Sequence, residues 1–288
     1  MDAASLTTAD GLALQLREWP HAGDTAGGTA RGTVLVVHGL GEHIGRYAHV
    51  AAVLVEAGWN VVGFDQRGHG RSDGGRGLLE HADSLLTDLA LVVDATRRAH
   101  PGRLVLLGHS MGGLVAARFV AGGVAPSVGE FPWHRRIDAL VLSAPALNAG
   151  MSSAQRLLLG AVGPLAPNIA VNNGLQAEWL SRDPAVVAAY RADSLVHDRI
   201  SPRLARFIVD GGREVLERAP HWDVPTLLLY PGADRCVSPA GSARFAAAAP
   251  AGVVTAREFA HLFHEIFNEP EQDEVFSVLR EWLERLAG

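Results

Sequence analysis

Short, mostly continuous runs of apolar residues recur along the chain, separated by segments whose apolar residues follow a helical spacing. The runs are rich in Val and Leu and lie at 33–38, 60–65, 103–108, 138–143, 226–230 and 252–259. They predict strands covered on both faces, because a strand with one solvated face alternates apolar and polar residues. The segment at 12–19 does alternate, and predicts an amphipathic strand.

Segments with helical periodicity follow most of these strands. They lie at 46–57, 81–99, 111–121, 239–248 and 270–287, and a Gly- and Thr-rich loop is expected at 21–32. Alternating strands and helices predict the α/β class: a mostly parallel sheet, helices on both of its faces, and a functional edge at the carboxyl ends of the strands.

One region, from 148 to 220, breaks this alternation. It has helical and loop patterns and no good strand. Because it leaves the core after one strand and returns before the next, we expect a helical cap over the functional edge rather than an independent domain. The predicted organisation is therefore a core of residues 1–147 and 221–288 with a cap at 148–220.

Composition and charge narrow the class of protein. Of the 288 residues, 48% are hydrophobic and 19% charged, the net charge is −6, and no long run of Lys or Arg occurs. We therefore expect a globular chain that does not bind nucleic acid. Cys236 is the single cysteine, which excludes an internal disulfide and favours a reduced thiol over a catalytic one.

The cellular location is predicted from the charged and apolar segments of the chain. The start of the chain lacks the basic and apolar regions of a signal peptide, and no apolar run reaches the roughly 18 residues that a membrane span needs. We expect a cytoplasmic protein, with contact to a lipid surface left open.

The sequence GHSMG at 108–112 stands between a predicted strand and a predicted helix. In that context G-x-S-x-G predicts a nucleophile elbow, with Ser110 as the nucleophile and Gly108, Gly112 and Gly113 leaving room for a tight turn. The alternative is that Ser110 only caps the following helix. A cap does not require glycine on both sides.

A serine nucleophile needs an imidazole base and a carboxylate that orients it, here in the chain order Ser, acid, His. Asp234 follows the strand at 226–230, although a turn or cap role would also explain it. Asp223 precedes that strand and would lie at the opposite edge of the sheet. His261 and His264 both follow the strand at 252–259, and periodicity does not choose between them.

Two backbone N–H groups are expected to form an oxyanion hole, those of Met111 and Leu40. Glu42, His43 and Arg46 follow at spacings that bring a carboxylate and a guanidinium together, either to hold this entry loop or as an ordinary surface pair. The segment DQRGHGRSDG at 65–74 predicts a structural turn held by Arg67 and Asp73. No metal-ligand spacing occurs, so we expect no metal and no cofactor.

Several segments together resemble the serine α/β-hydrolases, and within them the monoacylglycerol lipase and lysophospholipase group. They are HGLGEHIGRY, FDQRGHGRSDG, GHSMGG, LSAPAL, SRDPAVVAAYRADSLVH, GADRCVSPAGS and HEIFNEPEQDEVF. The resemblance spans nearly the whole chain and is strongest to actinobacterial monoglyceride lipases.

The resemblance implies that His264, directly before EIFNEP and 30 residues after Asp234, is the base. That group usually has glycine where His261 stands, so a role for His261 is left open. Residues 148–220 would be a lid that admits one acyl chain, with a narrower polar end for glycerol. Tyr190 joins Glu42 and Arg46 as a candidate contact of the substrate or entry loop.

The implied activity is hydrolysis of a monoacylglycerol, a small lipid ester, through an acyl-enzyme. A lysophospholipase or a short-chain carboxylesterase would use the same groups, and a non-catalytic lipid-binding protein could retain the fold. The apolar stretch at 156–171 suits an acyl groove or a lipid surface, and equally suits packing of the cap on the core.

Overall fold

A computed structural model describes residues 4–21, 30–124, 129, 131–151 and 153–287. Most of the loop expected at 21–32 lies outside the described residues. The strands of the main sheet are β1 (Ser5–Thr7), β2 (Ala13–Trp19), β3 (Thr33–Val37), β4 (Asn60–Phe64), β5 (Leu104–His109), β6 (Ala139–Ser143), β9 (Thr226–Pro231) and β10 (Val254–Phe259).

These eight strands form one sheet in the order β1-β2-β4-β3-β5-β6-β9-β10. The six strands from β4 to β10 in that order run parallel, whereas β2 is antiparallel to β4 and β1 to β2. The predicted α/β class with a mostly parallel sheet is confirmed. The sequence pattern missed β1, which is only three residues long.

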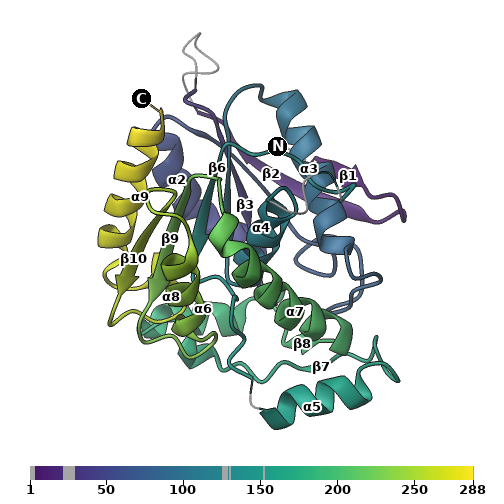
Figure 1. The fold of residues 1–288 in the computed structure, drawn as a ribbon. Helices are drawn as coiled ribbons and strands as arrows, with labels where there is room; N and C mark the ends of the chain where they lie inside the picture. Colours follow the sequence, from purple (N-terminus) through teal and green to yellow (C-terminus); the bar gives the residue numbers. More distant parts are fainter. Residues whose placement is uncertain (1–3, 22–29, 125–128, 130, 152, 288) are drawn as a thin grey trace.

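Helices cover both faces of this sheet (Figure 1). Their bounds are α2 (Ala48–Glu56), α3 (Ser84–Ala99), α4 (Met111–Ala121), α5 (Ser153–Val162), α6 (Pro184–Ala192), α7 (Pro202–Arg218), α8 (Pro239–Ala248) and α9 (Gln272–Ala287), with 3-10 turns η1 (Ile44–Tyr47), η2 (Ala177–Trp179), η3 (Ala219–His221) and η4 (Ile266–Asn268). The helices expected at 111–121 and 239–248 have the predicted bounds. The segment expected at 46–57 is divided between η1 and α2.

Successive residues of the central strands point to opposite faces, and each face has its own apolar core. In β3, Val34 and Val36 belong to the core that includes residues of α2 and α9, whereas Leu35 and Val37 belong to the core that includes residues of α3, α4 and α8. This explains the continuous apolar runs, since every position of β3, β4, β5, β6 and β9 is buried. The expectation of two covered faces is wrong for β10, an edge strand with four exposed residues.

The segment between β6 and β9 contains α5, α6 and α7, as its helical pattern predicts. It also contains a two-stranded antiparallel sheet of β7 (Val171–Asn172) and β8 (Arg199–Ile200), so the expectation of no strand there is wrong. Each strand is two residues long, too short for a periodic signal. Helix α7 packs on α4 of the core, and α5 lies at the end of the molecule remote from the C-terminus (Figure 1). In the described part of the chain, no helix combines the length and hydropathy that crossing a membrane requires.

Candidate active site

Ser110 lies on the turn that joins β5 to α4, at the carboxyl edge of the sheet. Its backbone has φ 54° and ψ −120°, and its side chain makes no capping hydrogen bond to the helix. A positive φ is costly for a residue with a side chain. The hydroxyl is therefore presented on a strained turn and is not used as a helix cap.

The glycines around Ser110 are required by close backbone approach. A Cβ on Gly112 would lie 2.1 Å from the carbonyl oxygen of Val37, and a Cβ on Gly108 would lie 2.5 Å from that of Gly112. No side chain fits at such distances, because the neighbouring atoms belong to the backbone of β3 and α4. The first turn of α4 is thereby packed directly against the end of β3.

His264 and Asp234 reach Ser110 from two loops at the same edge of the sheet. His264 follows β10, and its Nε2 lies 2.8 Å from Ser110 Oγ. Asp234 follows β9, and its Oδ2 lies 2.8 Å from His264 Nδ1. Because a carboxylate only accepts, Nδ1 donates to Asp234, which leaves Nε2 to accept the Ser110 hydroxyl proton. His261 is exposed, in the turn after β10.

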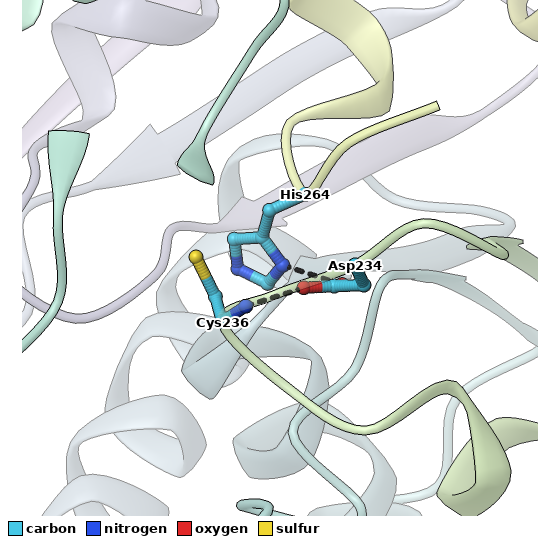
Figure 2. Close-up of side chains that lie close together, drawn as sticks. All are labelled: Asp234, Cys236 and His264. Carbon is cyan, nitrogen blue, oxygen red and sulfur yellow. Dashed lines mark hydrogen bonds and ion pairs between the residues drawn. The ribbon is translucent and has the colours of Figure 1, made fainter. Parts of the chain in front are cut away.

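Asp234 is itself held in place by its loop. Its Oδ1 accepts hydrogen bonds from the backbone N–H groups of Cys236 and Val237, at 2.8 and 3.0 Å, and Figure 2 shows Oδ2 directed at the imidazole. Burial by itself lowers the pKa of His264, but the adjacent Asp234 carboxylate outweighs it and raises the pKa above its ordinary value. The imidazole is thus both oriented and made more basic.

Leu40 and Met111 line the same cavity as Ser110. The loop that carries Leu40 comes close to the serine, since a Cβ on Gly39 would lie 3.2 Å from Ser110 Cβ. Glu42 holds this loop, because its Oε1 accepts the Gly39 N–H at 2.6 Å. These contacts bring the two expected oxyanion residues to the serine from β3 and β5.

The Glu42 and Arg46 side chains form a buried pair, which excludes the surface alternative. Arg46 Nη1 lies 2.8 Å from Glu42 and 2.7 Å from Glu265, and Nη2 also bonds Glu265. Burial raises the pKa of Glu42, but Arg46 and neighbouring donors lower it to about 2. Tyr190, from α6, stacks its ring over the Arg46 guanidinium at 4.9 Å and lines a neighbouring cavity rather than the one at Ser110.

The turn at 65–74 has the structural character expected of it. Arg67 is buried and bonds Asp88 through two nitrogens, at 2.6 and 2.7 Å, while its Nη1 bonds Asp10 and Glu80. Asp73 accepts the Ala13 N–H at 2.9 Å. Both residues tie the turn to the core and neither contacts Ser110.

A cavity of about 670 Å³ opens beside Ser110, within the size range of small-molecule sites. The insertion and the core both contribute to its walls. Its apolar lining includes Leu40, Met111, Met151, Leu175, Ile200 and Ile208. Among the described residues that line it, Asp234 is the only one with a carboxylate.

Sequence reasoning did not identify three neighbours of the site. His109 is buried with its ring 4.8 Å from that of His264, and burial with the nearby imidazole lowers its pKa to about 4. Glu265 pairs with Arg46 across 219 residues of sequence, a distance no local pattern reveals. In the sequence, only its place directly after His264 indicated that Glu265 lies near the site.

Cys236 is the third, and lies beside His264 and Asp234 (Figure 2). The three side chains place ligand atoms within 4.8 Å of one another, which the spacing rules for metal sites did not predict. Both Asp234 oxygens and both His264 nitrogens already have hydrogen-bond partners. Burial raises the pKa of the Cys236 thiol, which disfavours the thiolate that a metal would need. These side chains therefore suit the hydrogen bonds that link Ser110, His264 and Asp234 better than they suit a bound metal ion.

Comparison with known proteins identifies the family. The model of the family described as serine aminopeptidase, S33, matches residues 28–271. A monoacylglycerol lipase of Mycolicibacterium smegmatis is 38% identical over 257 residues, 88% of each chain, and a phospholipase of Bacillus subtilis is 29% identical over 86% of this chain and 93% of its own.

The structural comparison agrees with the sequence comparison. The crystal structure of a monoacylglycerol lipase from Paleococcus ferrophilus superposes with a TM-score of 0.81 at 32% identity, covering 95% of this chain and 99% of that one. The resemblance to serine α/β-hydrolases seen in the sequence motifs is confirmed. The chain belongs to the S33 serine aminopeptidase family and has the α/β-hydrolase fold.

Proposed function

We propose that this protein is a serine hydrolase that cleaves the ester bond of monoacylglycerols. The proposal rests on one observation. Two 2.8 Å hydrogen bonds join Ser110 to His264 and His264 to Asp234, at the wall of a largely apolar cavity. Distances of this length are what proton transfer between a nucleophile and its base requires.

The proposed reaction begins with attack of Ser110 Oγ on the ester carbonyl while its proton passes to His264 Nε2. Asp234 stabilises the imidazolium that forms. The N–H groups of Leu40 and Met111 bind the oxyanion, and collapse of the intermediate releases glycerol, protonated by His264, and leaves an acylated serine. Water, deprotonated by the same imidazole, then attacks the acyl carbon, and His264 returns the proton to Ser110 Oγ as the fatty acid is released.

Ester substrates are favoured over peptides by the chemistry of the cavity. An aminopeptidase needs a negative group that binds the ammonium of its substrate. Among the described residues that line the cavity, only Asp234 has a carboxylate, and both of its oxygens are already hydrogen-bonded. The apolar lining suits an acyl chain instead. Two relatives named as monoacylglycerol lipases, at 38% and 32% identity, support the choice of a monoacylglycerol.

Lysophospholipid is the second candidate substrate, because an exposed arginine lies at the cavity. Arg235 lines the cavity and stacks at 5.2 Å on Phe263, so its guanidinium could pair with a phosphate. The relative of Bacillus subtilis that is named a phospholipase supports a substrate with a phosphate group. We expect Arg235→Ala to change monoacylglycerol hydrolysis less than threefold. A larger effect confined to lysophospholipid would support the second candidate.

The segment 148–220 is proposed as the lid, with α7 as its fixed base on α4. Leu157, Leu165, Ile169 and Val171 are between 53% and 85% exposed, and all belong to this segment. Such apolar side chains suit transient contact with a lipid surface. The Leu165→Ser, Ile169→Ser double variant should sediment with phosphatidylcholine vesicles at least threefold less than wild type. Equal sedimentation would contradict the contact.

A substrate panel tests the main proposal. Initial rates with monoacylglycerols of several chain lengths should exceed those with lysophosphatidylcholine, a triacylglycerol and a short-chain ester. Ser110→Ala should lower the monoacylglycerol rate by at least about 10³-fold. A clear preference for lysophosphatidylcholine would overturn the substrate assignment. Failure of wild type to react with a serine-directed fluorophosphonate would instead favour a non-catalytic lipid-binding protein.

A further inference from the structure

The backbone on both sides of His264 is fastened to the segment Leu180–Arg182 of the insertion. The N–H of Glu265, the next residue, donates to the Leu180 carbonyl at 2.8 Å. The N–H of Phe263, the preceding residue, donates to Glu269 Oε2 at 2.9 Å. Glu269 is bonded in turn to Ser181 and Arg182.

Glu269 is the centre of this attachment. Its side chain is buried, and its Oε1 accepts from the Ser181 hydroxyl at 2.7 Å and from the Arg182 backbone N–H at 2.6 Å. Its Oε2 accepts from Arg182 Nε at 2.7 Å. A buried carboxylate with four donors is satisfied only while the insertion and the His264 loop keep this arrangement.

Asp234 and Arg46 hold side chains of this loop. Asp234 fixes the direction of the imidazole ring, and Arg46 holds the Glu265 side chain. The hydrogen bonds to Leu180 and Glu269 act on the main chain instead, and so set how far the ring extends toward Ser110. The 2.8 Å separation between Nε2 and Oγ depends on that position.

We propose that Glu269 is a positioning residue for the general base, and that Leu180–Arg182 is a fixed part of the active site rather than a moving part of the lid. This inference rests on the proposed role of His264. It requires that substrate enters by movement elsewhere in the insertion, while Leu180–Arg182 stays on the His264 loop.

The rate at which a fluorophosphonate labels Ser110, followed by intact-protein mass spectrometry, tests the proposal without any choice of lipid substrate. Glu269→Gln should label about 30-fold more slowly than wild type, because a shift of about 1 Å in a reacting group can cost 10²-fold. Ser181→Ala, which keeps the Glu269 charge and removes one of its four donors, should label three- to tenfold more slowly. For both variants the acid limb of the pH–rate profile should move to lower pH, as the hydrogen bond to Asp234 loosens.

Asp88→Asn is the matched control, since it also neutralises a buried, arginine-paired carboxylate, but that carboxylate bonds Arg67 of the turn at 65–74 instead of the His264 loop. It should label within twofold of wild type, with an unshifted pH profile, even where its thermal midpoint falls. If Glu269→Gln does not fold, Ser181→Ala carries the test alone.

Labelling of both Glu269→Gln and Ser181→Ala within twofold of wild type would overturn the proposal. So would an equal loss in Asp88→Asn, which would indicate general destabilisation. A wild-type chain that labels normally but hydrolyses no monoacylglycerol would refute the proposed substrate and leave the positioning result standing.

Discussion

Ser110 occupies a backbone conformation, φ 54° and ψ −120°, that glycine adopts far more readily. The strain of such a residue is of the order of 1–3 kcal/mol and persists only where the surroundings enforce it. Here the end of β6 and the residues after it help to enforce it, since the Ser110 N–H donates to the Ser143 carbonyl and the Ser110 carbonyl accepts from the Ala146 N–H. The hydroxyl is exposed to His264 at the expense of local stability.

This strain predicts an inverted order of stability for two inactive variants. Ser110→Gly and Ser110→Ala both remove the hydroxyl, but only glycine relieves the positive φ. We expect Ser110→Gly to be more stable than Ser110→Ala by about 1 kcal/mol in urea unfolding, although glycine normally lowers stability. Equal free energies of unfolding would mean that the turn is not strained.

Two short elements far apart in the sequence, η1 and the His264 loop that leads into η4, are joined by Glu42, Arg46 and Glu265. Arg46 bonds both carboxylates, and the two glutamates are each about 95% buried. Since Glu42 also holds the Gly39 N–H, the loop that carries Leu40 is connected to the loop that carries His264. The proposed oxyanion donor and the proposed base therefore share one support.

Removing the Arg46 guanidinium should lower the free energy of unfolding. Arg46→Met leaves two buried carboxylates without a counter-charge, and we expect a loss of about 3–5 kcal/mol in the free energy of unfolding. Adding Glu265→Gln to this variant should restore part of the loss, because it removes one of the repelling charges. A double variant less stable than Arg46→Met alone would show that the carboxylates do not repel.

For the whole molecule, burial of neutral histidines links stability to pH. His109 has its pKa lowered from 6.5 to about 4, mainly by burial, so between these values the unfolded chain binds more protons than the folded one. Stability is then lost as pH falls through this window. Burial and its histidine and arginine neighbours similarly lower the pKa of His69, whereas the raised pKa of His264 acts in the opposite direction.

The contribution of His109 can be isolated by substitution. Its share of the stability lost between pH 8 and pH 5 is about 2 kcal/mol, from the linkage of proton binding to folding. His109→Gln should reduce the difference in unfolding free energy between these two pH values by that amount. His261→Gln, at an exposed histidine, is the control and should leave the difference unchanged. An unchanged difference in His109→Gln would contradict the account.

The sheet and most of its helices follow from local pattern. The central strands are buried at every position, and the sequence shows this burial as runs of Val and Leu. Strands that bury few residues give little hydrophobic pattern. The strands β1, β7 and β8 have two or three residues each and were not predicted. The exposure of β10 was missed although Thr255, Arg257 and Glu258 interrupt its apolar run, as suits an exposed edge strand.

By itself, the sequence determined the identity of the strained serine, since only glycine on both flanks allows α4 to approach β3 so closely, and it limited the base to two histidines. The family resemblance of its motifs selected His264, and the structure places that imidazole at Ser110. Only the tertiary structure decided that Glu42 and Arg46 are buried with Glu265, and that the insertion holds the backbone around His264 through hydrogen bonds. The contacts of His264 with Ser110, Glu265 with Arg46 and Glu265 with Leu180 join residues 154, 219 and 85 positions apart. Their energies depend on burial and direction in space, and adjacency in the chain encodes neither.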